Sequence, residues 1–371
     1  MDALSRILRE RGAIISGSDA QVGAGHRREN ITADIDAVVI NGAIADDNVE
    51  LLRARELGIT IIGREELLAD IESGYKNRIA VAGCHGKSTT VAMIGAVLRA
   101  AGFNPTVHCG AKMNSEVPPN ALILGGTDYF VTEACEFKRS FLKLNPTVAV
   151  ITNIDFDHAD CYRDIYDVRE TFRQFADKCP TVIQHDNDQT AEVVIQNIKL
   201  RVAGAHNREN AILAVKVGLH FGVSVGVIRS ALENFTGIER RFQNLGKVGE
   251  CDVIADFAHH PTEIHACIDT ATEIYGAGKF LIVFQPHTYT RTIALFDDFL
   301  RVLKRADCVV YKTYSAREKE IKGGTGRDLA HSARLPYFKT AEALKKFLMK
   351  KSKKYRAIVL TGAGDVCYIP L

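Results

Sequence analysis

The sequence predicts an α/β protein built from three domains, and three observations support this prediction. The chain has 371 residues, which is too long for one ordinary domain and fits two or three domains of ~100–170 residues each. Short apolar segments alternate with amphipathic helical segments, a pattern that favours parallel sheets covered by helices. A glycine-rich turn at residues 83–86 follows one of these apolar segments and precedes a helical one.

The first predicted domain covers residues 1–75 and is expected to be a truncated Rossmann-like unit. Residues 13–19, 37–40 and 59–62 are predicted strands, and residues 48–57 have helical spacing. A doubly wound unit normally begins with a strand and a glycine-rich turn, whereas this sequence begins with a charged amphipathic helix. We therefore expect the first strand and its loop to be missing from this domain.

Two further α/β domains are predicted after it. The second covers residues 76–240, and the third covers residues 241–371 and is expected to be Rossmann-like. Each contains four apolar segments that are predicted strands, at residues 79–82, 121–124, 129–132 and 147–152 in the second domain and at residues 253–256, 280–284, 308–311 and 357–360 in the third.

Composition and cysteine content favour a cytoplasmic protein. The 47 basic and 45 acidic residues leave a net charge of +2, which gives no support for nucleic acid or a membrane surface as a partner. The nine cysteines include no Cys-x-x-Cys pair, so free thiols in a reducing cytosol are expected. The first residues do not resemble a signal peptide, and no apolar run approaches the ~20 residues that span a bilayer. The oligomeric state is left open between a monomer and a homodimer.

The segment Gly83-Cys84-His85-Gly86-Lys87-Ser88-Thr89 has the chemistry of a phosphate-binding loop. Its glycines let backbone N–H groups approach phosphate oxygens, and the start of the next helix adds a partial positive charge. Lys87 would supply a full charge to the β- and γ-phosphates, and the hydroxyl of Ser88 or Thr89 would reach Mg²⁺. A chance Gly-Lys in an ordinary strand–turn–helix is the alternative. The strand before and the helix after favour an ATP site, and hence a second domain that is P-loop ATPase-like.

Acidic and histidine residues follow two other strands of the same predicted sheet. Glu133 comes after the strand at residues 129–132, and His158 ends a cluster, NIDFDH, after the strand at 147–152. Ligands of open α/β sheets gather at the carboxyl ends of the strands. Glu133 is a candidate ligand for Mg²⁺, and His158 is a candidate for a second metal or a phosphate. Taken singly, each could instead be a helix cap or a structural side chain.

Together with further segments, these motifs resemble the Mur ligase family. Residues 204–210 (GAHNREN) are similar to the adenine-contacting segment of that family, and residues 237–242 (GIERRF) to its junction into the third domain. The match extends to the family branch that joins L-alanine to UDP-N-acetylmuramate. Segments similar to that branch are DFAHHPTE at 256–263, QPHTYTRT at 285–292, and SGSD at 16–19 with NGAI at 41–44.

The resemblance implies an ATP-dependent carboxylate–amine ligase. The γ-phosphoryl group of ATP would move to the carboxylate of UDP-N-acetylmuramate, and the amine of L-alanine would then displace phosphate from the acyl phosphate. ATP and Mg²⁺ are the implied cofactors, and the reaction would belong to peptidoglycan precursor synthesis.

The resemblance also implies roles for individual residues. The implied catalytic residues are Lys87, Glu133, His158 and Arg241. Ser88 and Glu133 would hold one Mg²⁺ and His158 a second. The implied ATP-binding residues are Gly83, Cys84, His85, Gly86, Lys87, Ser88, Thr89, Asn207, Asn210 and Asp256, with the two asparagines beside adenine. The implied substrate-binding residues on the amino-acid side are His259, His260 and Arg291.

Two alternatives remain open from the sequence. One is an ATP-binding relative that does not ligate and acts as a regulatory module. The other is a recycling ligase that joins a whole peptide to the sugar nucleotide. The presence of Lys87, Glu133, His158, Asn207 and Arg241 favours a working ligase.

Overall fold

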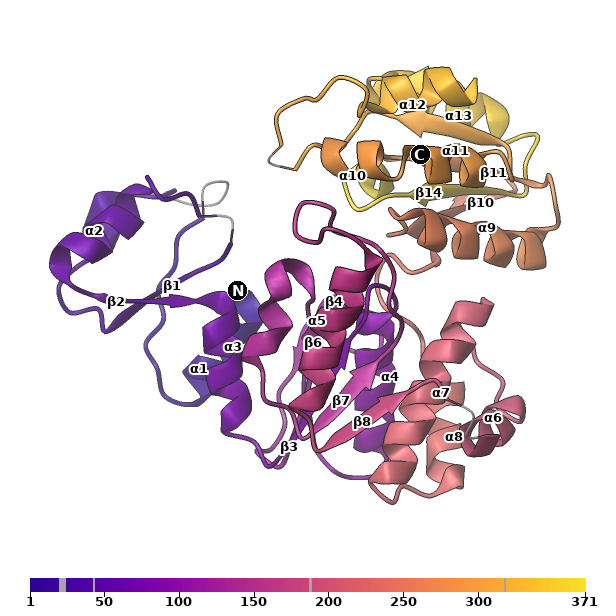
Figure 1. Cartoon of the computed structure of the whole chain (residues 1–371). Helices are drawn as coiled ribbons and strands as arrows, with labels where there is room; N and C mark the ends of the chain where they lie inside the picture. The colour runs from indigo at the N-terminus through magenta and orange to yellow at the C-terminus, as the bar shows by residue number, and fades with distance from the viewer. Residues whose placement is uncertain (20–24, 43, 187–188, 317) are drawn as a thin grey trace.

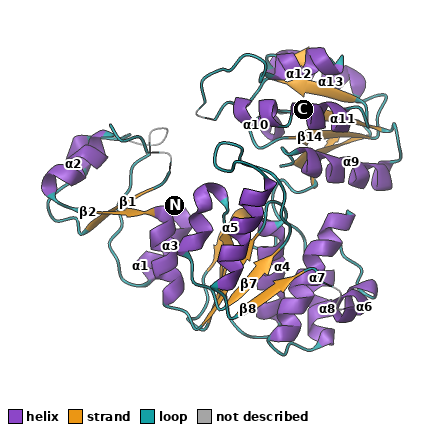
Figure 2. Cartoon of the chain, in the orientation of Figure 1, coloured by secondary structure: helices purple, strands orange, loops and turns teal. Residues whose placement is uncertain are grey.

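A computed structural model gives the fold, and it describes residues 1–19, 25–42, 44–186, 189–316 and 318–371. Ala43, which belongs to the NGAI motif, lies outside the described residues. The described strands form one two-stranded and two six-stranded sheets. Figures 1 and 2 show the strands in the interior of the two larger bodies, with helices around them. The three-domain α/β class predicted from the sequence is confirmed, while the boundaries near residues 75 and 240 stay a prediction.

The N-terminal part contains a small parallel sheet. Its strands pair in register, with Ala37 opposite Thr60. Its elements are α1 (Asp2–Glu10), η1 (Arg28–Asn30), β1 (Ala37–Ile40), α2 (Val49–Leu57), β2 (Thr60–Gly63) and α3 (Arg64–Ser73).

The strand predicted at residues 13–19 is wrong for the part from 13 to 18, all of which the structure describes without a strand. The side chain of Ile14 is fully exposed. An apolar segment becomes a strand only where a neighbouring strand and a core receive it, and residues 13–18 are exposed apart from the half-buried Ile15.

The central sheet is mostly parallel, in the order β5-β4-β6-β3-β7-β8. Strand β3 lies in the middle, paired with β6 on one side and β7 on the other, and only β5 runs antiparallel to its neighbour. Its elements are β3 (Asn77–Ala82), α4 (Lys87–Ala100), β4 (Thr106–Met113), β5 (Asn120–Ile123), β6 (Tyr129–Ala134), η2 (Phe137–Lys143), β7 (Val148–Ile151), α5 (Ile165–Asp177), β8 (Thr181–Gln184), α6 (Gln189–Gln196), α7 (Ala205–His220) and α8 (Val225–Glu233).

The third sheet has the order β13-β12-β11-β14-β10-β9, parallel except for β9. Its elements are β9 (Gln243–Val248), β10 (Cys251–Asp256), α9 (Pro261–Tyr275), β11 (Phe280–Phe284), α10 (Tyr289–Ala294), α11 (Phe296–Leu303), β12 (Cys308–Tyr311), α12 (Gly326–Ala333), β13 (Tyr337–Phe338), α13 (Ala341–Lys351), β14 (Ala357–Thr361) and η3 (Val366–Tyr368).

Two N-terminal helices pack onto the central sheet. Leu4 and Ile7 of α1 and Ile71 of α3 belong to the same buried cluster as Ala80 of β3 and Phe130 of β6. The two helices therefore share a core with the central domain, while α2, β1 and β2 extend away from it in Figure 1.

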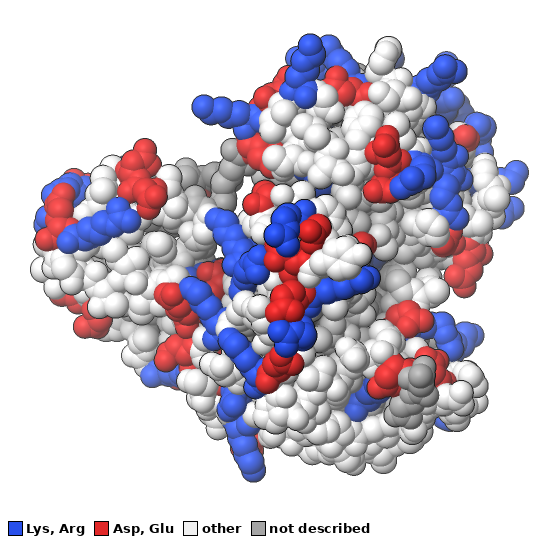
Figure 3. Space-filling view, viewed as in Figure 1, with Lys and Arg blue, Asp and Glu red and all other residues white. Residues whose placement is uncertain are grey.

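The surface shows mixed charge. In Figure 3, Lys and Arg side chains are interspersed with Asp and Glu side chains over the face in view. Among the described residues, no helix is both long and apolar enough to cross a membrane.

Candidate active site

The phosphate loop joins the central strand β3 to α4, and its two glycines are required by their surroundings. Gly83 and Gly86 have φ angles of 140° and 83°, which residues other than glycine rarely adopt. A Cβ on Gly83 would lie 1.9 Å from Thr152 Oγ1, and a Cβ on Gly86 would lie 2.4 Å from Asn210 Oδ1. The close packing of the loop against its neighbours therefore excludes any larger residue.

Lys87, the first residue of α4, lies against a buried carboxylate. Its Nζ is 2.9 Å from Glu136 Oε2 and also donates to the backbone oxygen of Gly83. The Glu136 side chain is only 3% exposed. Burial would lower the pKa of Lys87, but the charge of Glu136 outweighs it and raises that pKa above its usual range. The loop lysine is therefore a fixed cation at the carboxyl edge of the sheet.

Ser88 and Glu133 lie on either side of Cys109. The Sγ of Cys109 is 3.4 Å from the backbone oxygen of Ser88 and 3.9 Å from Glu133 Oε1. The same Glu133 oxygen accepts a hydrogen bond from the backbone N–H of Gly110. Ser88 carries a hydroxyl and Glu133 a carboxylate, and both are hard oxygen donors of the kind that Mg²⁺ prefers, so the residues present fit the ion.

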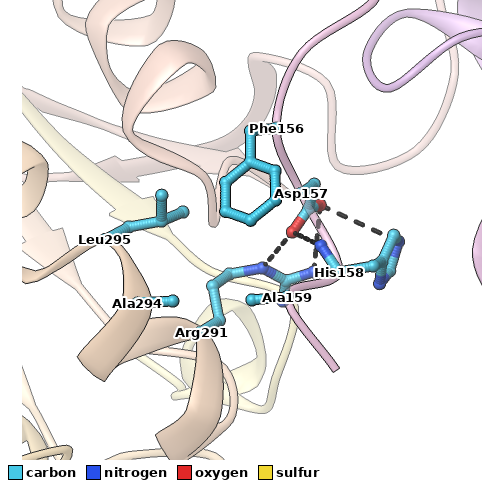
Figure 4. Close-up of a pocket in the computed structure, with 7 residues that line it drawn as sticks. All are labelled: Phe156, Asp157, His158, Ala159, Arg291, Ala294 and Leu295. Atoms are coloured by element: carbon cyan, nitrogen blue, oxygen red, sulfur yellow. Dashed lines mark hydrogen bonds and ion pairs between the residues drawn. The ribbon is translucent and has the colours of Figure 1, made fainter. Parts of the chain in front are cut away.

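The loop after β7 reaches the third domain through an ion pair. Arg291 of α10 donates to Asp157 from Nε at 2.8 Å and from Nη2 at 3.1 Å, and Figure 4 shows the two side chains facing each other. Both side chains are less than a tenth exposed. Burial would raise the pKa of Asp157, but Arg291 holds it well below its usual range. Asp157 is therefore an anion that fixes the position of Arg291.

A neutral histidine completes this group. Arg291 Nη1 lies 2.9 Å from His287 Nδ1. Because a guanidinium only donates, Nδ1 accepts and the proton of the neutral ring belongs on Nε2. Burial lowers the pKa of His287 to about 4, so the ring is neutral at physiological pH.

A cavity of about 800 Å³ lies beside these groups. Its wall comes from all three parts of the chain: Ser18, His26 and Asn41 from the N-terminal part, Phe137 and residues 157–160 from the central part, and His287, Arg291, Tyr314 and Glu318 from the third domain. His158 lies on this wall, with Nε2 3.8 Å from both Glu136 Oε1 and Asp157 Oδ2. The contact of Lys87 with Glu136 therefore adjoins the cavity through His158.

A second connection joins the third domain to the phosphate loop. His85 lies between two carboxylates, with Nε2 3.1 Å from Asp155 Oδ2 and Nδ1 3.4 Å from Glu263 Oε1. Glu263 also lies 3.5 Å from Arg241 Nη1, and the guanidinium of Arg241 is stacked over the Phe257 ring. Arg241 and His85 therefore meet at one carboxylate of α9.

The remaining predicted residues lie deeper in the structure. Asn210 accepts from Thr90 Oγ1 at 3.2 Å and donates to Asn207, and both amides are buried against the start of α4. Asp256 accepts the backbone N–H groups of Phe242 and Ala258, each at 2.8 Å, and burial raises its pKa to about 6.

The two histidines predicted on the amino-acid side lie elsewhere in the site. The ring of His259 is 2.9 Å from the backbone oxygen of Phe257, and that of His260 is 3.2 Å from the backbone oxygen of Phe156. Burial lowers the pKa of His259 to about 3, so that ring is neutral. Of the three residues predicted on the amino-acid side, Arg291 lines the cavity, whereas His259 and His260 are not among the described residues of its wall. The ring centroid of His259 lies 5.5 Å from that of His287, and the ring centroid of His260 lies 4.8 Å from that of His85.

The structure thus brings Lys87, His158 and Arg291 to one region and places Arg241 at the phosphate loop. It adds titratable residues that the sequence did not single out, namely Glu136, Asp155, Asp157, Glu263, His287 and Glu318. Most of them stand inside the recognised motifs, a few positions from selected residues. Their position within those motifs was the sequence feature that could have identified them as site residues.

Comparison with known proteins shows the family of the chain. Three family descriptions match in order along the chain: "Mur ligase family, catalytic domain" at residues 1–76, "Mur ligase middle domain" at 81–197, and "Mur ligase, glutamate ligase domain" at 240–364. The chain belongs to the Mur ligase family.

Curated relatives are named UDP-N-acetylmuramate–L-alanine ligase. The protein of Agathobacter rectalis is 35% identical over 434 aligned positions, covering 100% of this chain and 94% of the relative. That of Caldicellulosiruptor bescii is 34% identical, covering 99% of this chain and 94% of the relative. The alignment with the first is longer than the 371 residues of this Mur ligase, so segments of the relative face gaps here.

Solved structures show the same Mur ligase fold. The UDP-N-acetylmuramate–alanine ligase of Thermotoga maritima superimposes with a TM-score of 0.76 at 26% identity, covering 98% of this chain and 88% of its own. A murein peptide ligase of Psychrobacter arcticus superimposes with a TM-score of 0.72 at 22% identity, covering 100% and 94%.

Proposed function

We propose that this chain joins L-alanine to the carboxylate of UDP-N-acetylmuramate with hydrolysis of ATP to ADP and phosphate. The observation that carries the proposal is the continuity between the phosphate loop and the cavity, through Lys87, Glu136 and His158. An ATP-using ligase needs its phosphoryl donor next to the carboxylate that is activated. The name shared by the relatives over the whole chain supports this choice of substrates.

On the ATP side, Lys87 stabilises the negative charge of the transferred phosphoryl group. Ser88 and Glu133 would hold one Mg²⁺ and His158 a second, and these ions would neutralise phosphate charge. The backbone of residues 83–89 cradles the phosphates, and Asn207 and Asn210 are proposed beside adenine. Arg241 and Asp256 approach the nucleotide from the third domain.

On the acceptor side, Arg291 binds the carboxylate of the amino acid. Asp157 already holds its guanidinium in place, so the Arg291 side chain loses little conformational freedom when the amino acid binds. His287 presents an N–H from the same wall. His260 connects α9 to the central domain at the backbone oxygen of Phe156, and the ring of His259 lies beside that of His287 on this wall.

The proposal includes the organisation of the protein. The domains are residues 1–75 for the UDP substrate, 76–240 for ATP, and 241–371 for the amino acid and for closing on ATP. We propose a cytoplasmic enzyme that works as a monomer or a homodimer on small molecules.

A phosphate-release assay tests the proposal. The purified chain is supplied with ATP, Mg²⁺ and UDP-N-acetylmuramate, with and without L-alanine, and the product is identified by mass spectrometry. Phosphate release that requires both the sugar nucleotide and L-alanine is expected. ADP formation independent of the sugar nucleotide would contradict a ligase and favour the regulatory module. Turnover with a peptide but not with L-alanine would identify a recycling ligase.

A further inference from the structure

Glu263 on α9 is the point where the third domain contacts the phosphate loop, and its role follows from four neighbours. Its carboxylate accepts the backbone N–H groups of His259 at 3.0 Å and His260 at 3.3 Å, which caps the start of α9. The same carboxylate faces His85 of the phosphate loop at 3.4 Å and Arg241 at 3.5 Å. A cap alone does not require the last two contacts.

The ring of His85 is held as a cation by its surroundings. Both ring nitrogens face carboxylate oxygens, Asp155 on one side and Glu263 on the other, and carboxylates only accept. Both nitrogens therefore donate, which requires the imidazolium. This also removes the ring from any metal site with Asp155 and His260, although the three residues lie close together, because a protonated nitrogen has no lone pair for a metal.

The backbone of His85 is fixed from the other side. Its N–H donates to Asn153 Oδ1 at 2.9 Å, and its carbonyl oxygen accepts from Asn153 Nδ2 at 2.9 Å and from Thr152 Oγ1 at 2.6 Å. The end of β7 therefore holds the main chain of the loop, while α9 holds its side chain. The loop geometry depends on both domains.

We propose that Glu263 is a positioning residue for ATP, which acts through the cation of His85 to fix the phosphate loop when the third domain is docked. This inference rests on the proposed function, because it assumes that the loop binds ATP. It makes nucleotide affinity depend on a side chain that stands outside the nucleotide loop.

Calorimetric titration with ATP and Mg²⁺, without other substrates, tests the inference. Glu263→Gln keeps an acceptor for the cap of α9 but removes the charge that faces His85. ATP affinity is expected to fall at least tenfold near neutral pH. Glu273→Gln, an exposed change on the same helix, is the matched control and is expected to leave affinity within twofold.

The pH dependence separates positioning from a merely structural role. Burial alone would lower the pKa of His85, but its hydrogen bonds to Asp155 and Glu263 raise it to about 9. The ring of His260 also faces the ring of His85, with 4.8 Å between the ring centroids, and burial lowers the pKa of His260. The wild-type affinity for ATP should therefore stay constant from neutral pH and weaken as the pH rises through about 9. In Glu263→Gln, His85 loses one anion, so the weakening should begin at a lower pH.

A second variant keeps the test valid if Glu263→Gln unfolds. His85→Gln leaves α9 and its cap unchanged and is expected to lower ATP affinity to a similar degree. The double variant should lose little more ATP affinity than either single variant, because both substitutions remove the same interaction between His85 and Glu263.

Two results would overturn the inference. One is that Glu263→Gln binds ATP with wild-type affinity. The other is that Glu263→Gln binds ATP more weakly but with the same pH dependence as the wild type. Wild-type protein that binds no ATP would instead overturn the proposed function, and this inference with it.

Discussion

Lys87 and Glu136 form a buried ion pair in which each side chain depends on the other. A charge that loses its partner in the interior is costly, because it is neither hydrated nor compensated. The lysine that the sequence predicts to be a phosphate ligand is therefore also a structural residue. Its two roles can be separated experimentally.

Lys87→Ala is expected to abolish turnover and to lower the free energy of unfolding by about 3–5 kcal/mol, because it leaves Glu136 buried and unpaired. Chemical denaturation and the phosphate-release assay measure the two effects. The double variant Lys87→Ala with Glu136→Gln is expected to regain most of the stability and none of the turnover. Wild-type stability in the single variant would show that the pair contributes nothing.

At the scale of elements, strand β3, the loop at residues 83–86 and α4 form one unit whose geometry is set by glycine. Gly86 lies in the left-handed region and directly faces the Asn210 amide of α7. The loop is thus shaped by a helix more than a hundred residues further along the chain, and small changes at this contact should affect phosphate binding.

Gly86→Ala is expected to weaken ATP binding at least tenfold, since a Cβ would lie 2.4 Å from Asn210 Oδ1 and the φ of 83° disfavours alanine. Titration with ATP measures the loss. Gly226→Ala is the matched control, because Gly226 is exposed in the first turn of α8 with nothing within 4 Å of the added Cβ. It should leave binding unchanged and stabilise the helix by up to ~1 kcal/mol. Equal binding by both variants would contradict the tight packing of the loop.

At the scale of the whole molecule, the N-terminal part and the central domain share a core through α1 and α3. Glu72 of α3 is buried at this junction, where Oε2 accepts the backbone N–H of Asn145 at 2.9 Å and Oε1 has no hydrogen-bond partner among the described residues. Burial raises the pKa of Glu72 from 4.5 to about 7. The folded state therefore holds this proton more tightly than the unfolded chain does.

The stability that comes from this more tightly held proton of Glu72 is fully present below pH 4.5 and is lost as the pH rises through about 7. Glu72→Gln should therefore stabilise the protein by about 1–3 kcal/mol at pH 8 and have little effect at pH 5. Thermal melting at the two pH values measures the difference. Asp70→Asn, an exposed change on the same helix, should show no such pH dependence. An equal effect of Glu72→Gln at both pH values would contradict the raised pKa.

The sequence by itself determined the fold class and the strand–turn–helix unit of the predicted phosphate loop, because both depend on local information. Alternation of apolar segments and helices predicts parallel sheets, and glycines around a lysine after a strand predict the loop. The order of the motifs was enough to identify the family.

Only the tertiary structure decided which charges meet. Lys87 pairs with Glu136, 49 residues away, and His85 lies between Asp155 and Glu263, which come from different domains. Residues 13–18 begin with an apolar run that predicts a strand, yet they form none and stay exposed apart from the half-buried Ile15. Backbone conformation is encoded mainly by nearby residues, whereas side-chain partners are set by the packing of segments that are distant in the chain.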